Sequence, residues 1–146
     1  MINILAVDDE KHILRLIQNA LAKEGYYVTA VSDPQELEKL KLTEYQLILL
    51  DVMMPGKDGF ALCGEIRDSV DCPILFLNAK TEEADIMKGL GVGGDDYITK
   101  PFGIGELRAR VAAHLRRETR EKKQAVSVGG VQFLLKAKKV RYKDEE

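Results

Sequence analysis

Residues 47–56 read LILLDVMMPG, a run of four apolar residues that ends on an aspartate. An apolar run of this length, followed by turn residues, is typical of a strand buried on both faces, as in parallel sheets. A charge beside such a strand is costly unless it has a partner or a function. Asp51 is therefore a candidate functional residue at the end of a predicted strand.

Four similar apolar runs lie elsewhere in the chain, at residues 4–7, 27–31, 74–77 and 97–99. Helical patterns alternate with them. The first ends near Gly25, and others open at the DPQE of residues 33–36, near Asp58 and after a predicted capping residue, Thr81. In the first, fourth and fifth helices the apolar stripes are Ile13, Leu14, Ile17 and Leu21; Ile86 and Leu90; and Ile104, Leu107, Val111 and Leu115. Alternating strands and helices predict an α/β fold, a doubly wound parallel sheet with helices on both faces.

In doubly wound sheets, ligands bind where the strands end. The polar residues expected at that edge are Asp8 and Asp9, Asp51, Asn78 and Lys100. Clustered carboxylates repel one another unless a cation lies among them, and oxygen ligands without His or Cys favour Mg²⁺. Carboxylates, magnesium and a lysine together indicate phosphoryl transfer, with Asp51 as the nucleophile.

Three motifs carry a specific resemblance: DDE at residues 8–10, LLDVMMPG at 49–56 with Asp58 and Gly59, and GDDYITKPF at 94–102. Together they resemble the response-regulator receiver domain of the OmpR/PhoB type, over about residues 2 to 118. The resemblance implies a flavodoxin-like fold with five strands in the order 2-1-3-4-5. It also implies a cytoplasmic signalling protein that a histidine kinase phosphorylates.

The resemblance assigns roles residue by residue. Asp51 is the expected phosphoacceptor, and Lys100 is expected to bind the phosphoryl group. Asp8, Asp9 and the main-chain carbonyl of Met53 complete the expected magnesium site with Asp51. Two further implied features are a cis peptide bond between Lys100 and Pro101 and a switch aromatic at Tyr97.

Asn78 departs from the family, which normally has Thr or Ser at the end of the fourth strand. The amide still offers an N–H donor, so phosphoryl transfer is expected to survive. It is bulkier than a hydroxyl, however, and we expect the coupling from phosphate to Tyr97 to be atypical.

The subfamily dimerises on activation through its fourth helix, fifth strand and fifth helix. The charges that match this interface are Lys88, Asp96, Glu106, Arg110 and Arg117. Ile86 and Gly91 replace residues that are commonly charged, and two glycines, Gly103 and Gly105, should loosen the start of the last helix. We therefore expect a weakened homodimer.

A charged stretch after Leu115 could continue the last helix or serve as a linker, and a domain boundary is expected there. The expected division is a receiver at residues 1–118, a linker at 119–125 and, at 126–146, a truncated start of a winged-helix DNA-binding domain. Val126, Val128, Val131, Phe133 and Leu135 partly alternate and predict a short β fragment there. Because base readout needs an element that enters a groove, DNA binding is expected only through the missing C-terminal domain.

Composition excludes several classes of protein. A net charge of −2 over 146 residues argues against a protein that coats nucleic acid, and no apolar run approaches the length of a membrane span. Cys63 and Cys72 lack metal-site spacing, so we interpret them as free packing thiols. The chain is expected to be a phosphoacceptor with only self-catalysed phosphorylation and dephosphorylation, and not an enzyme.

Alternatives remain open. Taken singly, Asp8 or Asp9 could cap a helix, Lys100 could be a surface lysine, and Tyr97 could be an ordinary strand aromatic. An aspartate-nucleophile phosphatase of the haloacid-dehalogenase type would use Asp8 but leaves Asp51 unexplained. A flavodoxin-like cofactor binder is disfavoured because paired aspartates repel phosphate. A phosphorylation-independent interaction module is compatible with Asn78.

Overall fold

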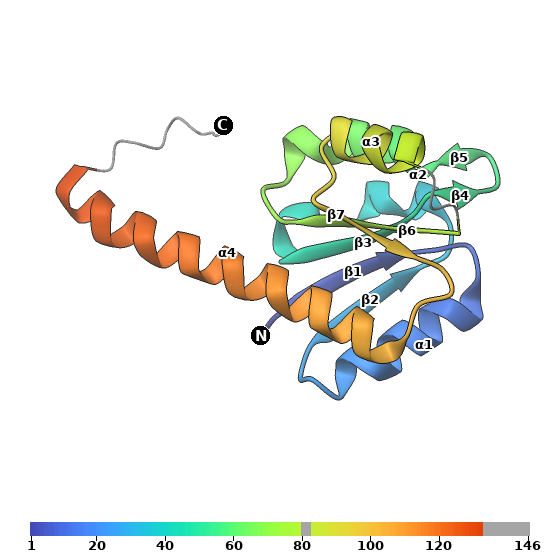
Figure 1. Ribbon diagram of the computed structural model, residues 1–146, viewed down its shortest axis with the longest axis horizontal. Helices are drawn as coiled ribbons and strands as arrows, with labels where there is room; N and C mark the ends of the chain where they lie inside the picture. Colours follow the sequence, from blue (N-terminus) through green and yellow to red (C-terminus); the bar gives the residue numbers. More distant parts are fainter. Residues whose placement is uncertain (80–82, 133–146) are drawn as a thin grey trace. The chain divides into compact units, whose positions relative to one another are not determined.

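The structure, a computed structural model, describes residues 1–79 and 83–132 (Figure 1). The chain divides into two compact units, the first spanning Met1–Ala112 and the second beginning at Ala113. The first unit contains a sheet of five strands, all parallel, in the order β2-β1-β3-β6-β7. These strands are β1 (Asn3–Val7), β2 (Tyr27–Val31), β3 (Leu47–Asp51), β6 (Ile74–Asn78) and β7 (Asp96–Thr99). Counted along the chain this is the order 2-1-3-4-5, so the predicted topology is confirmed.

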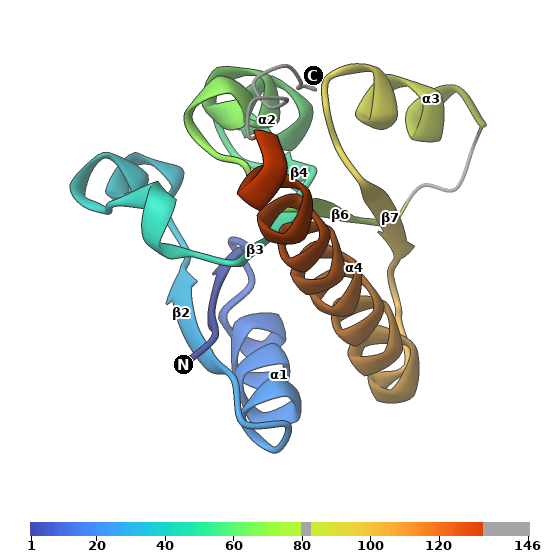
Figure 2. The same ribbon diagram turned by 90° about the vertical axis from the view of Figure 1, so that its left-hand side faces the viewer.

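Helices cover both faces of the sheet (Figures 1 and 2). α2 (Gly59–Ile66) and α3 (Glu83–Gly91) lie on one face, while α1 (Lys11–Ala22) and the first turns of α4 (Ile104–Gln132) lie on the other. The remaining elements are three short 3₁₀ helices and a small hairpin: η1 (Pro34–Lys39), η2 (Leu42–Glu44), η3 (Arg67–Ser69), β4 (Met53–Met54) and β5 (Lys57–Asp58). This is the α/β fold with two helical layers that the sequence predicts.

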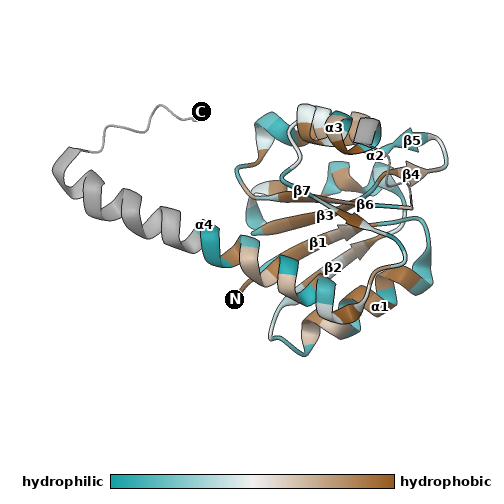
Figure 3. Ribbon diagram, in the orientation of Figure 1, coloured by the Kyte–Doolittle hydropathy of each residue, from teal (hydrophilic) through white to brown (hydrophobic). Residues whose placement is uncertain are grey.

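The core follows the apolar runs of the sequence. Residues 4–7 of β1 and 47–50 of β3 are completely buried, as expected for central strands covered on both sides. Figure 3 shows the hydrophobic residues concentrated on the strands. On α1 the predicted stripe is confirmed, because Leu14, Ile17 and Leu21 are buried, and Gly25 follows the helix with a φ of 88°. The core therefore holds the strand ends, and with them the polar residues, in place.

The second predicted helix is shorter than expected. Asp33 does cap it, since its carboxylate accepts a hydrogen bond from the backbone of Gln35 at 3.0 Å. The segment is nevertheless a six-residue 3₁₀ helix in which only Leu37 is buried. A single buried residue provides too little packing to sustain an α-helix of this length.

The predicted apolar stripe of α3 is only half correct. Ile86 packs against the core, but Leu90 is 49% exposed. The buried residue is instead Gly89, where an added Cβ would lie 2.9 Å from the ring of Phe60 and 3.0 Å from the ring of Phe76. The helix therefore approaches the sheet through a glycine, which turns Leu90 outward. The predicted cap, Thr81, lies outside the described residues.

α4 continues through the expected linker at 119–125 and through residues 126–132, where the sequence predicted strand. The β structure predicted for residues 126–132 is therefore wrong, whereas a helix over residues 119–125 agrees with the alternative that the charged stretch continues the last helix. Residues 116–124 are mostly strong helix formers, and a helix extends more easily than it starts. The rest of the predicted β fragment, residues 133–146, lies outside the described residues, and the division into domains stays a prediction.

Candidate functional site

Three carboxylates gather at the carboxyl ends of the central strands. Asp8 and Asp9 follow β1, and Asp51 is the last residue of β3. One oxygen from each lies within 4.8 Å of the others. Asp8 is completely buried and Asp51 is only 3% exposed. The structure thus brings together the acidic residues that the sequence placed at this edge.

Lys100 enters the same cluster from the loop after β7. Its Nζ donates hydrogen bonds to Asp8 at 2.8 Å and to Asp51 at 3.1 Å. The Lys100–Pro101 peptide bond is cis, as expected. The backbone N–H of Lys100 donates to the carbonyl of Asn78 at 2.8 Å, which ties the loop to β6. Hydrogen bonds of both the side chain and the backbone of Lys100 therefore fix the position of its ammonium group.

Asp8 has a second, structural role. One of its carboxylate oxygens accepts a hydrogen bond from the backbone of Glu10 at 2.9 Å, just before α1 begins. Asp8 thus fixes the turn before α1 but does not cap it, since the cap position is Glu10 and has no side-chain hydrogen bond, and the site role of Asp8 stays a prediction. Glu10, to which the sequence assigned no role, lies 3.5 Å from Lys100 Nζ. Its place in the DDE motif was the available signal.

Burial, and after it repulsion by Asp8, raise the pKa of Asp51 from 3.8 to about 7, although Lys100 lowers it. Burial lowers the pKa of Lys100, but its hydrogen bonds and charge interactions with Asp8 and Asp51 outweigh this effect, so that the net pKa is raised. The lysine thus stays charged yet offsets only part of the acidic charge. Three carboxyl groups face one ammonium, so acidic groups are in excess and the residues fit a divalent cation. Hard oxygen donors without nitrogen or sulfur ligands are those that Mg²⁺ prefers.

The loop after Asp51 is shaped by close packing of Gly59 against the backbone of Asp51, which the sequence patterns did not predict. β4 pairs with β5 in an antiparallel hairpin, and Gly56 at its turn has a φ of 75°. A Cβ on Gly59 would lie 2.1 Å from the carbonyl oxygen of Asp51. Only glycine therefore lets the start of α2 pass so close to the phosphoacceptor candidate, and Asp58 caps this helix through Phe60 N at 2.8 Å. The adjacent Asp58 and Gly59 were the available signal.

Asn78, the last residue of β6, and Tyr97, the second residue of β7, form a buried pair. The Nδ2 of Asn78 donates a hydrogen bond to the Tyr97 hydroxyl at 2.6 Å. Asn78 is 1% exposed, and the Tyr97 ring lies with its centroid 6.4 Å from that of Phe76. The structure thus places Asn78, which departs from the family pattern, in direct contact with Tyr97, the predicted switch aromatic.

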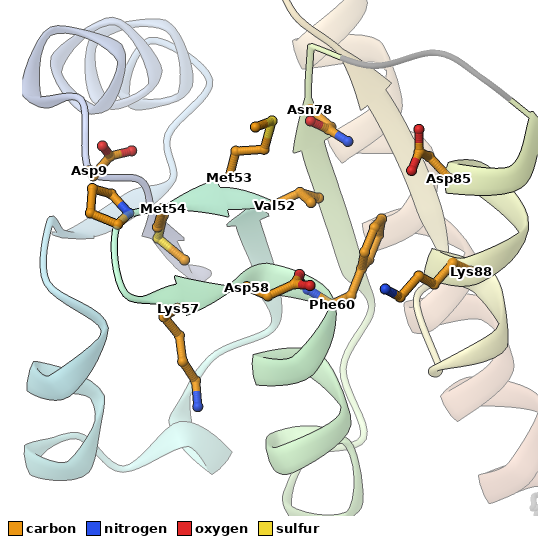
Figure 4. Close-up of a pocket in the computed structure, with 11 residues that line it drawn as sticks. Asp9, Val52, Met53, Met54, Lys57, Asp58, Phe60, Asn78, Asp85 and Lys88 are labelled. Carbon is orange, nitrogen blue, oxygen red and sulfur yellow. The ribbon is translucent and has the colours of Figure 1, made fainter.

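A groove of about 660 Å³ opens beside the acidic cluster (Figure 4). Phe60 and Lys88 face each other across it, with Lys88 Nζ 5.5 Å from the centre of the ring. The exposed side chain of Met53 lies at its edge. The lining residues are Asp9, Val52, Met53, Met54, Pro55, Lys57, Asp58, Phe60, Asn78, Asp85 and Lys88. Most of them were not predicted, because only the tertiary structure brings α2, α3 and the hairpin together.

The predicted interface charges make contacts within the chain. Arg110 lies 3.0 Å from both carboxylate oxygens of Asp96, and its Nε donates to Glu106 at 3.1 Å. Lys88 contacts Phe60 as described above, and Arg117 is exposed. Asp96, Glu106 and Arg110 therefore form one group, whereas Lys88 and Arg117 are not part of it.

A family model described as "Response regulator receiver domain" matches residues 4–112. The chain belongs to this family. It is 57% identical over 141 residues to the transcriptional regulatory protein SpaR of Bacillus subtilis, a match covering 96% of this chain and 64% of that protein. Two solved structures are similar as well. A two-component response regulator from Clostridium difficile has a TM-score of 0.77 at 32% identity, covering 81% of this chain and 98% of the other. DrrB, described as a Thermotoga maritima OmpR/PhoB homolog, has a TM-score of 0.75 at 31% identity, covering 81% and 54%.

The receiver is thus homologous to OmpR/PhoB-type regulators, as the motifs indicate. The chain spans about half to two thirds of the length of the curated relatives it matches. Across residues 1–79 and 83–132, none of the helices combines the length and apolar character needed to cross a membrane.

Proposed function

We propose that this receiver accepts a phosphoryl group on Asp51 from a histidine kinase. One observation carries the proposal: Asp51 is buried at a strand end, hydrogen-bonded to Lys100 and surrounded by two further carboxylates. A nucleophilic carboxylate beside a fixed ammonium is the arrangement that phosphoryl transfer requires.

In the transfer, a carboxylate oxygen of Asp51 forms a bond to phosphorus as the phosphorus–nitrogen bond of the kinase's phosphohistidine breaks. The histidine ring keeps the electron pair of that bond and takes up a proton. Lys100 lies within hydrogen-bond distance of Asp51 and can neutralise charge on the phosphoryl oxygens. Hydrolysis of the acyl phosphate would return Asp51 to its original state. The chain is thus a self-catalysing phosphoacceptor and not a turnover enzyme.

Magnesium is the proposed cofactor. Asp8, Asp9 and Asp51 would hold it through carboxylate oxygens, and the main-chain carbonyl of Met53 is proposed as a further ligand. When bound, the ion supplies positive charge to the phosphoryl oxygens and to the crowded carboxylates. The raised pKa of Asp51 supports this assignment, because burial and the charge of Asp8 raise it by more than Lys100 lowers it, and a bound cation would favour the ionised carboxylate.

The output is proposed to be a cytoplasmic change in conformation and in homodimerisation that regulates transcription. Lys88, Asp96, Glu106, Arg110 and Arg117 are the proposed dimer contacts, and Arg110 must exchange intrachain partners to reach a second copy. This supports a weakened dimer. DNA contact is proposed to need a C-terminal domain beyond the receiver at residues 1–118, with the start of a winged-helix domain proposed from residue 126. The description of SpaR as a transcriptional regulatory protein supports that output.

The decisive experiment maps the acid-labile phosphate after incubation with acetyl phosphate and magnesium. Phosphate on Asp51, absent in Asp51→Asn, is the expected result. Phosphate on Asp8 would instead indicate a phosphatase of the haloacid-dehalogenase type. An unmodified protein would support a phosphorylation-independent interaction module, the second candidate that the bond between Asn78 and Tyr97 favours.

A further inference from the structure

A second groove, of about 570 Å³, lies between α2 and the short helices η1 and η2. Its floor is apolar and includes Leu37 of η1, Leu42 of η2, and Leu62 and Ile66 of α2. The segment on its η1 side is a 3₁₀ helix of six residues that buries only Leu37, so it leaves part of the floor uncovered. A groove of this volume can receive several apolar side chains of a ligand.

Acidic side chains border this floor on both sides. Asp33 and Glu38 lie on the η1 side, Glu65 lies on the α2 side, and all three residues are exposed. The carboxylate of Asp33 caps η1, whereas Glu38 makes no ion pair with the residues that the structure describes. Among the described residues that line the groove, the one cation is Lys57, which forms an ion pair with Glu65. Three carboxylates therefore face one ammonium.

The hairpin of β4 and β5 borders the second groove as well as the phosphoacceptor candidate. Pro55 and Lys57 line both this groove and the groove beside the acidic cluster. The hairpin also carries Met53, which pairs with Asp58 and whose main-chain carbonyl is a proposed magnesium ligand. An occupant of the second groove would therefore touch the loop that borders the acidic cluster.

An apolar floor with carboxylates on both sides is complementary to an amphipathic helix that has lysine or arginine on both sides of its apolar stripe. Such a helix packs its apolar face into a hydrophobic groove. Its long basic side chains can lie along apolar surface while their charged ends reach carboxylates at the rim. An acidic segment would be repelled by Asp33, Glu38 and Glu65, and so would the phosphates of a nucleic acid.

We propose that the second groove is a docking site for a basic amphipathic helix of a partner protein. The apolar stripe of that helix lies over Leu37 and Leu62, and its cations pair with Glu38 on one side and Glu65 on the other. Lys57 competes for Glu65, so docking replaces an intrachain ion pair with an intermolecular one. The inference goes beyond the phosphoacceptor role of Asp51 and does not depend on it.

The test measures peptide binding to the intact chain. The probe is a fluorescein-labelled synthetic helical peptide in which leucines at helical spacing are flanked by lysines. One control peptide has glutamate in place of lysine, and the other has the same composition as the probe in an order that gives no apolar stripe. Fluorescence anisotropy gives the affinities. We expect the probe to bind at least about tenfold more tightly than either control.

Substitutions at the rim test whether the probe binds in this groove. Glu38→Lys should weaken binding at least about fivefold, because it turns attraction into repulsion. Glu44→Lys is the matched control: Glu44 is exposed and belongs to η2 but does not line the groove, so affinity should change less than about twofold. Lys57→Gln should tighten binding about threefold, since it removes the cation that competes for Glu65. Lys39→Gln, in η1 but outside the lining, should have a smaller effect.

Several results would overturn the inference: equal binding of the three peptides, equal loss of affinity in Glu38→Lys and Glu44→Lys, or unchanged or weaker binding to Lys57→Gln. Self-association that Glu38→Lys abolishes in equilibrium sedimentation would do so too, since the occupant would then be a second copy. The three peptides are compared on the wild type, so that comparison decides even if circular dichroism shows a variant to be unfolded. No phosphate or magnesium is added, so the result is independent of the test of Asp51.

Discussion

The carboxylates at the ends of β1 and β3, with the ammonium of Lys100 from the loop after β7, form a charged half of the site, whereas the amide of Asn78 at the end of β6 and the phenol of Tyr97 within β7 form a neutral half. The first pair of strands gathers like charges that burial makes costly, which raises the pKa of Asp51. In the neutral half, the side chains of Asn78 and Tyr97 share a hydrogen bond, and Gly89 and Gly94 leave little room around the ring of Phe76. We expect the charged half to carry the chemistry and the neutral half to govern the conformational response.

The largest expected effect tests whether the chemistry belongs to the charged half alone. Asp51→Asn should lower phosphorylation by acetyl phosphate at least about a thousandfold, because the amide is a poor nucleophile. Phosphate incorporation with magnesium present measures it. Asp58→Asn is the matched control, since Asp58 lines the groove but lies outside the acidic cluster. An equal loss of phosphate incorporation in both variants would contradict the assignment of the chemistry to the acidic cluster.

The second prediction concerns the stability of the metal-free protein. The pKa of Asp51 is raised from 3.8 to about 7, so between these values the folded state holds a proton that the unfolded state has released. Stability should therefore fall as the pH rises through this window. At 1.36 kcal/mol per pKa unit, the loss is at most about 4 kcal/mol. Urea denaturation in a chelating buffer at about pH 5 and about pH 8 measures the part of this loss above pH 5, at most about 3 kcal/mol.

The control for this prediction is Asp51→Asn, which should be more stable than the wild type at the higher pH and should show a flatter pH profile. Asn78→Leu, in the neutral half, should leave the pH slope unchanged. If the wild type and Asp51→Asn have parallel profiles, the carboxylate is not under electrostatic strain.

The third prediction separates the two partners within the charged half. Lys100→Met removes the charge that faces the phosphoryl oxygens and should slow phosphorylation about a hundredfold. It should also raise the pKa of Asp51 further, because Lys100 lowers it in the wild type. The rate as a function of pH should then rise at a higher pH than in the wild type. If the rate fell equally at every pH, without a shift of the pH profile, a direct effect of Lys100 on the pKa of Asp51 would be contradicted.

The smallest effect probes the packing of the neutral half. A Cβ on Gly94 would lie 2.2 Å from the Phe76 ring, so Gly94→Ala should destabilise the fold by about 1–3 kcal/mol. Gly91→Ala is the control, because a Cβ there meets nothing within 4 Å and alanine favours helix. Thermal denaturation of both variants, compared with the wild type, measures the difference. Equal stability would show that Phe76 can move aside.

Much of the candidate site could be read from local patterns. Asp51 was found because a charge ends a buried strand, and Asp8, Asp9 and Lys100 because parallel strands end at one edge. The hairpin packing at Gly59 and the approach of α3 through Gly89 were not found, since they depend on distances between elements far apart in sequence. The strand predicted for residues 126–132 was wrong. Alternation of a few valines is weak evidence for a strand, because extending an existing helix costs less free energy than starting a new element.

The sequence by itself determined the sheet, the order of its strands and the identity of the acidic residues, because hydrophobic periodicity and the cost of burying charge act locally along the chain. Only the tertiary structure decided that Asn78 contacts Tyr97 and that one end of its amide is buried without a partner among the described residues. A hydrogen bond between residues 19 positions apart depends on the register of two strands and on the packing of Phe76, neither of which leaves a periodic trace in the sequence.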